Sequence, residues 1–287
     1  VQVLTAAVLP APAFAISVVS LFPVIPKSEQ ENMRFDTAQY RRKEVELQRV
    51  DSIMRMLPSH AEQVLEAGCR EGYITLKLAG IYPSVTALDL NMPGIVHPRV
   101  ACVQGDIKAL DFPDKSFDLV ICTEVLEHIP PQKLEKACAE LLRVTRRYLL
   151  IGVPFRQDLR VHATRCIHCG SINPTTGHVN SFDLQQLMSL FGNMPFSRTE
   201  YPGRGVYKTN RLSYAVYERF GFPYGSYQQE EPCINCGKHL EKPRLSFPAR
   251  LACLFAKGLE FIQNKTGPSR SPVWIHVLWD ITGQDSF

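Results

Sequence analysis

The sequence predicts an α/β fold with a mainly parallel sheet, because short apolar runs recur along the chain and each ends in a turn that carries polar residues. The first run starts at Gln63 and leads through a glycine-containing turn into a helix at 73–79. The other predicted strands are residues 85–90, 99–105, 117–123, 148–153 and 273–279. A chain of 287 residues with 45% apolar content can bury one large core of this type.

The turn after the first strand is suited to bind a small molecule. Gly68 can adopt backbone angles that are closed to other residues, and it has no side chain to hold a ligand away. Glu66 lies two residues before it, where a carboxylate would repel the pyrophosphate of a dinucleotide. The loop therefore favours a cationic ligand.

Polar residues also follow the next three strands. Asp89 ends the second strand 21 positions after Gly68, and a carboxylate there can accept both hydroxyls of a ribose. Asp106 follows the third strand, and Glu124 follows the fourth. We expect these strand ends to converge on one crevice.

Four segments of the chain resemble those of a known family in their order and spacing. They read VLEAGCREG at 64–72, ALDL at 87–90, QGDI at 104–107 and FDLVICTEVLEH at 117–128. Over residues 45–155 the chain resembles the class I S-adenosylmethionine (SAM)-dependent methyltransferases, in particular a subgroup with Glu-Val-Leu-Glu-His after the fourth strand. The resemblance implies SAM as cofactor and a Rossmann-like sheet of seven strands, mostly parallel, with residues 273–279 as an antiparallel edge.

The resemblance also implies roles for individual residues. Glu66 and Gly68 would flank the methionine part of SAM, Asp89 would hold the ribose, and Asp106 with Ile107 would frame the adenine. The full set of implied cofactor residues is Glu66, Gly68, Cys69, Arg70, Gly72, Asp89, Leu90, Asp106, Ile107 and Glu124. Arg70 departs from the family, which usually has glycine there, so we expect a differently shaped turn or a contact made by Arg70 itself.

Methyl transfer from SAM is an in-line displacement, in which the enzyme mainly positions the acceptor and excludes water. A hydroxyl acceptor needs a base, and His128 and His178 are the candidates because a neutral imidazole accepts a proton at neutral pH. Alternatively, His128 only orients the turn at 124–127. An amine acceptor needs little more than a cage of carboxylates.

Two CxxCG segments predict a structural zinc site. Each cysteine pair can bind one ion from a tight turn, and two pairs complete a tetrahedral site formed by Cys166, Cys169, Cys233 and Cys236. His168 or His178 could replace one cysteine, and redox-active thiols or disulfides are the rival interpretations. The other five of the nine cysteines lie in apolar or loop contexts, which favours a reducing, cytoplasmic compartment.

The chain divides into four predicted segments. Residues 1–26 carry no charge and are rich in Ala, Val and Pro, and we expect 1–32 to be a non-native or disordered extension, with translation starting at Met33. A signal peptide or membrane anchor is the alternative, which the interrupting prolines and the missing basic start disfavour. Residues 33–155 form the SAM-binding domain, 156–247 a zinc-binding insertion that serves as a substrate lid, and 248–287 a helix and strand that complete the sheet.

Three further helices are predicted. An apolar stripe at 45–57 should pack on the sheet and contains Val45, Leu47, Val50, Ile53, Met54 and Leu57. A helix at 184–191 should be capped by Asn180 or Ser181. The segment 250–263 places apolar residues on one face, namely Leu251, Leu254, Phe255, Leu259 and Ile262. We expect that face to be core, with a helix on a membrane surface as the alternative.

Together these features predict a SAM-dependent methyltransferase that acts on an O or N atom of a small molecule or glycan. The net charge of +4 and the lack of a Lys/Arg block disfavour a nucleic-acid acceptor. One alternative is an RNA or protein methyltransferase that grips a polymer with Arg160, Arg165, Lys238, Lys242 and Arg244. The other is a non-catalytic, zinc-containing scaffold that retains the fold. No transmembrane segment is expected.

Overall fold

The computed structural model describes residues 41–174, 177–205, 207–227, 232–266 and 271–282. The predicted extension at 1–32 and the proposed start at Met33 lie outside the described residues. The unit Arg42–Phe287 is compact and contains the whole sheet.

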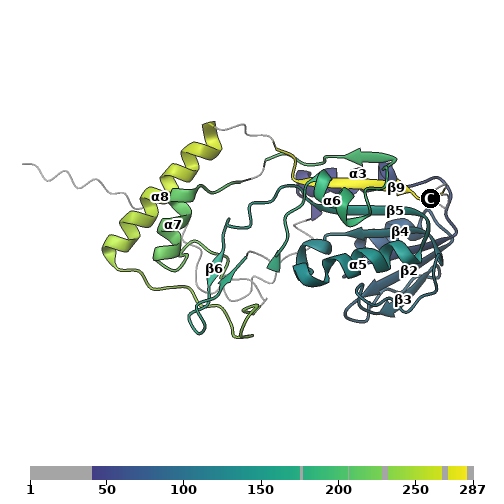
Figure 1. The fold of residues 1–287 in the computed structure, drawn as a ribbon, viewed down its shortest axis with the longest axis horizontal. Helices are drawn as coiled ribbons and strands as arrows, with labels where there is room; N and C mark the ends of the chain where they lie inside the picture. Colours follow the sequence, from purple (N-terminus) through teal and green to yellow (C-terminus); the bar gives the residue numbers. More distant parts are fainter. Residues whose placement is uncertain (1–40, 175–176, 206, 228–231, 267–270, 283–287) are drawn as a thin grey trace, which may run out of the picture. The chain divides into compact units, whose positions relative to one another are not determined.

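The main sheet of the described chain has seven strands in the order β3-β2-β1-β4-β5-β9-β8 (Figure 1). The strands are β1 (Gln63–Ala67), β2 (Ser84–Asp89), β3 (Val100–Gln104), β4 (Phe117–Thr123), β5 (Thr145–Pro154), β8 (Arg198–Glu200) and β9 (Trp274–Asp280). The first five are parallel, and β9 runs antiparallel to both of its neighbours. This confirms the predicted methyltransferase sheet, with one refinement: β9 lies inside the edge, because the short β8 pairs on its outer side.

Helices cover both faces of this sheet. On one face, α3 (Glu44–Met56) and α4 (Tyr73–Ala79) close a core with β1, β2 and β4. On the other face lie α5 (Pro131–Val144) and α6 (Leu184–Leu190), visible in front of the sheet in Figure 1. Because apolar side chains cover both faces, the parallel strands read as nearly continuous apolar runs in the sequence.

The helix α6 begins at Leu184, as predicted, but its N-cap is a different residue from the one expected. Asp183 is its N-cap, since its carboxylate accepts a hydrogen bond from the backbone N–H of Gln186, whose side chain accepts from the N–H of Asp183. This reciprocal pair is a capping box. The expectation that Asn180 or Ser181 caps the helix is wrong.

The segment between β5 and β9 contributes to two parts of the molecule. Its helix α6 and strand β8 belong to the layers of the main sheet. The remainder contains a two-stranded ribbon, β6 (Thr164–Arg165) with β7 (Ile172–Asn173), and the helices α7 (Arg211–Arg219) and α8 (Phe247–Thr266). Buried residues of α7 and α8 share a small core with Ala163.

The apolar stripe predicted on α8 is not core, so that expectation is wrong. Leu251, Leu254, Phe255 and Ile262 are all more than half exposed. The buried side of α8 instead carries mostly small residues, Ala249, Cys253, Ala256 and Glu260. Helix periodicity correctly predicted that these residues share one face of α8. It does not predict which of the two apolar faces of the helix packs against α7.

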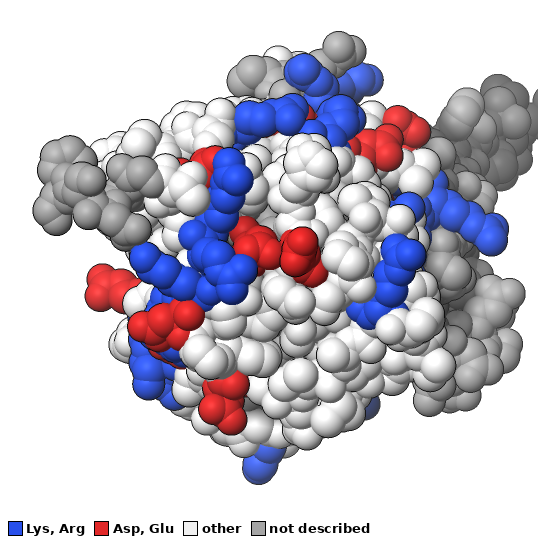
Figure 2. Space-filling model, turned by 90° about the vertical axis from the view of Figure 1, so that its right-hand side faces the viewer, with Lys and Arg blue, Asp and Glu red and all other residues white. Residues whose placement is uncertain are grey.

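Charged side chains on the surface form ion pairs of opposite sign. Arg146 pairs with Asp118 at 2.5 Å, and Arg143 pairs with Asp114 at 2.7 Å. On the face drawn in Figure 2, much of the surface carries no charged side chain, and Lys and Arg lie beside Asp and Glu mainly at its top and left. Such exposed pairs contribute little to the free energy of unfolding. Because their charges are opposite, they do not build up a strong electrostatic potential of one sign.

Glu260 is the polar anchor of α8. Its carboxylate accepts hydrogen bonds from Tyr207 and Tyr217, each at 3.0 Å, and from the hydroxyl of Thr209. We predict that Glu260→Ala lowers the free energy of unfolding by about 2–4 kcal/mol, because three hydroxyls, those of the buried Thr209 and Tyr217 and of the more exposed Tyr207, lose their acceptor. Urea unfolding of this variant beside Glu241→Ala, an exposed carboxylate near the start of the helix, measures the difference. Equal unfolding midpoints would contradict the assigned role.

Candidate active site

The carboxyl ends of three neighbouring strands meet at one edge of the sheet. Ala67 at the end of β1 lies opposite Leu88 of β2 and Cys122 of β4. The residues that follow these strand ends therefore leave the sheet side by side. This arrangement confirms that the predicted strand ends converge, and crevices at this edge are where open α/β sheets bind ligands.

The loop after β1 forms a tight, left-handed turn. Gly68 has φ 86° and donates its N–H to the carbonyl of Leu88 at 2.7 Å, and a β-carbon in its place would collide with Cγ2 of Val125. Gly72 has φ 79° and is the N-cap of α4. A β-carbon at Gly72 would likewise collide with the side chain of Ile95, so both positions favour glycine for space as well as for backbone angle.

Arg70 keeps the turn although it is not glycine. It adopts φ 47°, and its backbone N–H donates to the carboxylate of Asp89 at 2.8 Å. This hydrogen bond ties the first loop to the end of β2 and offsets the strain of a left-handed non-glycine residue. The carboxylate of Asp89 also accepts from the N–H of Asn91 at 3.4 Å, so its orientation is fixed.

Three buried carboxyl groups lie near this loop. Burial raises the pKa of Glu66 to about 7, although the hydroxyl of Thr75 donates to it and Arg49 lies nearby. Burial also raises the pKa of Glu124 and of Glu127, and the charge of Glu124 raises that of Glu127 further. One oxygen of Glu124 and both of Glu127 have no hydrogen-bond partner within the described part of the protein. This group of carboxyl side chains therefore favours a positive charge nearby.

Arg49 is the cation that partly balances these groups, and the sequence analysis missed it. It donates two hydrogen bonds to Glu46, at 2.8 and 2.6 Å, and Ser52 contacts Nδ1 of His276 at 2.8 Å. All four residues are buried, whereas Leu47 of the predicted apolar stripe is 41% exposed. The sequence does contain a pattern that indicates this buried polar side, because polar residues recur at every third position of α3. A search for apolar periodicity does not detect it.

Other predicted cofactor residues are placed as follows. Leu90 is 63% exposed just beyond β2, beside the similarly exposed Met92, while Ile107 and Cys69 are buried. Asp106 forms an ion pair with Lys108 at 2.7 Å. Burial raises the pKa of the Cys69 thiol to about 12, so it stays protonated. The loop residues and Asp89 lie together, whereas no described contact joins Asp106 to them.

His128 and His178, predicted from distant parts of the sequence, meet edge to face with ring centroids 4.6 Å apart. Nδ1 of His178 lies 2.7 Å from Oε1 of Gln157. Burial, together with the charge of His128, lowers the pKa of His178 to about 4, so it is neutral at physiological pH. Since Nδ1 donates to Gln157, the lone pair lies on Nε2. Together with Glu127, the two rings also form a group that can hold a metal ion.

The segment that carries His178 is bound to the turn after β4. The backbone N–H groups of Val179 and Asn180 donate to the carbonyl of Glu127, at 2.7 and 3.2 Å. The side chain of Asn180 donates to the carbonyls of Leu126 and Ile129, at 2.9 and 2.6 Å. Asn180 thus links the segment between β5 and β9 to the turn η1 (Leu126–His128).

The four predicted cysteines form one cluster. Sγ of Cys166 lies 3.6 Å from Sγ of Cys236, and Sγ of Cys169 lies 3.5 Å from Sγ of Cys233. A tetrahedral zinc ion with bonds of about 2.3 Å places its sulfur ligands about 3.8 Å apart, so the cluster fits such an ion. All nine cysteines are free, which argues against the disulfide interpretation. His168 and His178 are not members of the cluster.

The two cysteine turns have the same backbone hydrogen bonds. Gly170 donates to the carbonyl of Cys166 and Gly237 to that of Cys233, both at 2.9 Å. Hydrogen bonds from Ser171 lower the pKa of Cys169 to about 5. At Cys236 a backbone hydrogen bond from Lys238 is outweighed by desolvation and by the neighbouring thiols, which raise its pKa to about 12. The support for zinc is therefore the geometry of the four sulfur atoms.

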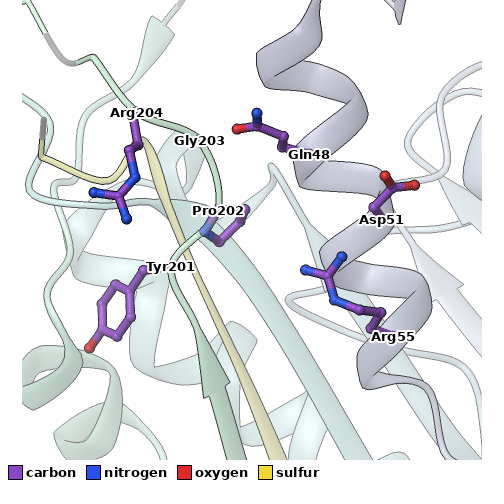
Figure 3. Close-up of a pocket in the computed structure, with 7 residues that line it drawn as sticks. All are labelled: Gln48, Asp51, Arg55, Tyr201, Pro202, Gly203 and Arg204. Atoms are coloured by element: carbon purple, nitrogen blue, oxygen red, sulfur yellow. The ribbon is translucent and has the colours of Figure 1, made fainter.

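A separate shallow pocket lies between α3 and the segment Tyr201–Arg204 (Figure 3). Its lining is Gln48, Asp51, Arg55, Tyr201, Pro202, Gly203 and Arg204. Arg55 is held by Glu200 at 2.7 Å. None of the predicted cofactor or metal residues lines this pocket, so it is not the site described above.

The strand order is that of the methyltransferase fold, and comparison with known proteins points to the same class. Residues 65–148 match the model of the methyltransferase domain family. A probable SAM-dependent methyltransferase of Mycobacterium tuberculosis is 35% identical over 102 residues, which is 33% of this chain and 37% of that protein. A ubiquinone biosynthesis O-methyltransferase of Xanthomonas oryzae pv. oryzae is 35% identical over 107 residues, 33% of this chain and 44% of that protein. The chain thus matches less than half the length of these curated relatives.

Among solved structures, N-methyltransferase NodS from Bradyrhizobium japonicum with S-adenosyl-L-homocysteine is 17% identical with a TM-score of 0.42, over 60% of this chain and 88% of that one. The YcgJ protein from Bacillus subtilis is 13% identical with a TM-score of 0.47, over 80% and 97%.

The residues present fit SAM. Its sulfonium and ammonium groups are cationic, which matches the raised pKa of Glu66 and the unpartnered oxygens of Glu124 and Glu127. The exposed apolar side chains of Leu90 and Met92 suit the adenine ring.

Gly68→Ala tests the shape of the loop. We predict at least about a tenfold loss of SAM affinity, because the new β-carbon meets Val125 and the left-handed backbone angle disfavours alanine. The measurement is the SAM concentration needed to raise the melting temperature. Gly94→Ala is the matched control, since a β-carbon at Gly94 has no neighbour within 4 Å. The same SAM dependence for both variants would refute this account of the loop.

The raised pKa of Glu66 predicts that SAM binding depends on pH. Below about 7 the free carboxyl is mostly protonated, and a cationic ligand favours its ionised form. Binding should therefore release a proton and strengthen about tenfold from about pH 6 to about pH 8. Calorimetry in two buffers of different ionisation enthalpy counts the proton. Glu66→Gln removes this contribution while leaving the titration of SAM itself, so identical proton release by both proteins would rule it out.

Proposed function

We propose that this protein transfers a methyl group from SAM to an oxygen or nitrogen atom of a small-molecule or glycan acceptor. The observation that carries the proposal is the set of carboxylates at the ends of three neighbouring strands: Glu66, Asp89 and Glu124. When bound, SAM supplies a methyl group already activated by its cationic sulfur.

In this proposal each carboxylate has a distinct role. Asp89, fixed by the N–H groups of Arg70 and Asn91, accepts the ribose hydroxyls. Glu66 and Glu124 face the cationic end of the cofactor, with Arg49 limiting their negative charge. The turn at Gly68 lets the backbone pass close beneath the ligand.

His178 is the proposed general base for a hydroxyl acceptor. Gln157 holds its Nδ1 proton, so Nε2 can take the proton from the acceptor oxygen as that oxygen attacks the methyl carbon. The low pKa keeps the ring neutral before the reaction, although it also makes the base weak. His128, in contact with His178, can position the ring or bind the acceptor. The name of the Xanthomonas relative, an O-methyltransferase, supports an oxygen acceptor.

A small acceptor is favoured over a polymer because of the partners of the basic side chains. Two residues that the polymer alternative needs are already neutralised: Arg160 donates to both oxygens of Asp158, at 2.8 and 2.9 Å, and Arg165 pairs with Glu218 at 3.6 Å. Binding a phosphate backbone requires Lys and Arg groups that face solvent without a fixed counter-charge.

The cysteine cluster is proposed to hold a structural zinc ion. Four protein ligands would leave no open position for a substrate, which is typical of structural rather than catalytic sites. The ion would join the two CxxCG turns, which are far apart in the sequence, and so stabilise the insertion that ends at the acceptor side.

Loss of the proposed base should affect catalysis and not cofactor binding. We predict that His178→Ala lowers kcat about 100-fold or more with a hydroxyl acceptor and leaves the SAM dissociation constant unchanged. The measurement is transfer of label from methyl-tritiated SAM to a panel of hydroxyl- and amine-bearing small molecules. His60→Ala, an exposed histidine elsewhere, is the control. Unchanged kcat with a hydroxyl acceptor excludes His178 as the base, and absence of transfer to any acceptor favours the scaffold alternative.

The zinc proposal predicts about one zinc ion per chain in the purified protein. Cys233→Ser should lose it almost completely and lower the unfolding midpoint, because a neutral hydroxyl is a poor zinc ligand. Cys102→Ser, outside the cluster, should keep its zinc. Elemental analysis gives the content directly, and a wild-type protein that binds no zinc after purification in zinc-containing buffer would refute the proposal.

A further inference from the structure

The helix α8 exposes an apolar stripe that no described part of the chain covers. Its large side chains are between 53% and 73% exposed, and we call Phe247, Leu251, Leu254, Phe255, Phe261 and Ile262 the α8 stripe. At 100° per residue these six positions fall within an arc of about 120°. Contiguous exposed apolar surface of this kind marks an interaction site more often than chance.

The stripe cannot turn inward, because the opposite side of α8 is fixed. The buried residues Cys253 and Ala256 pack in the small core shared with α7, and the hydroxyl of Ser213 donates to the carbonyl of Ala256 at 2.8 Å. Glu260 lies on the same side and holds three hydroxyl groups. The helix therefore has two apolar sides, of which one belongs to the fold and the other faces solvent.

Positive charge accompanies the stripe. Arg250, Lys257 and Lys265 are the basic residues of α8 and all are exposed, whereas its one acidic residue, Glu260, is buried. Residues 238–265 contain six Lys and Arg against two Asp and Glu, a net charge of +4. The whole chain also carries +4. The excess positive charge of the protein is thus concentrated on and beside α8.

We propose that α8 binds the surface of a lipid bilayer that contains anionic phospholipids. The α8 stripe would enter the boundary between headgroups and acyl chains, and the basic residues would contact the anionic headgroups. A helix with Phe and Leu on one side and Lys and Arg beside them is the pattern of helices that lie in the plane of the interface. Within the described chain no helix is long and apolar enough to cross a membrane, so α8 would lie on the surface.

A second copy of the chain fits the stripe less well. Lys257 lies at the middle of α8 and flanks the stripe, so a two-fold antiparallel pairing of the stripes would bring it against its own copy. Arg250 would likewise approach the basic end of the partner helix at Lys265. Like charges along one side of the stripe and at its C-terminal end disfavour self-association and favour an anionic surface.

Co-sedimentation of the full chain with vesicles tests the proposal. We expect binding to vesicles of phosphatidylcholine with phosphatidylglycerol, weaker binding in high salt, and little binding to phosphatidylcholine alone. The double variant Leu254→Ser/Phe255→Ser should lower the partition coefficient about tenfold or more, because two side chains lose their apolar burial. Leu76→Ser/Ile81→Ser is the matched control, as it removes two exposed apolar side chains outside α8.

A fluorescent reporter distinguishes insertion from electrostatic adhesion. Both native tryptophans are buried, so Phe255→Trp adds an exposed indole whose emission should shift to shorter wavelength on the anionic vesicles. Arg250→Glu/Lys265→Glu should weaken binding without changing the urea midpoint. Failure of the wild type to bind anionic vesicles overturns the proposal, as does equal binding by the Leu254→Ser/Phe255→Ser variant. A dimer in sedimentation analysis that this variant dissociates, without vesicle binding, would assign the stripe to a second copy instead.

Discussion

The cofactor site depends on an imbalance of buried charge. The guanidinium of Arg49 lies near the carboxyl groups of Glu66, Glu124 and Glu127. It also forms an ion pair with Glu46, so it balances the other three groups only in part. Isolated buried carboxylates are costly, so these groups favour the protonated form until another cation arrives. A ligand with positive charge and hydroxyl groups would balance the carboxyl groups and donate hydrogen bonds to Asp89. This is the physical reason for proposing SAM as the ligand of this region.

The position of His178 depends on the hydrogen bonds of Asn180. Its side chain and the neighbouring backbone hold the segment from Gly177 against the turn after β4, which places His178 beside His128. The same segment continues into the capping box of α6 and so into the main sheet. The proposed base and the fold thus depend on one set of hydrogen bonds. In the more distant part of the same inserted chain, the four-cysteine cluster joins two turns that are far apart in the sequence.

The sequence predicted the first five strands and the cofactor loop well, because buried parallel strands are continuous apolar runs and glycines mark their turns. It did not predict β8, which has three residues and no apolar pattern. It also missed the polar side of α3, where Arg49 pairs with Glu46 of the same helix and lies near Glu66 and Glu124, which come from distant parts of the chain. The stripe on α8 shows the same limit: periodicity finds an apolar side, whereas burial depends on which neighbour packs there.

The most direct test of the account is a calorimetric titration of the full chain with SAM, repeated on Asp89→Ala and on Asp111→Ala, an exposed carboxylate outside the site. The account predicts micromolar binding by the wild type and by Asp111→Ala, and an affinity at least about tenfold lower for Asp89→Ala, because the ribose hydroxyls lose their acceptor. Circular dichroism establishes that each protein is folded. A folded wild type that does not bind SAM would contradict the central claim.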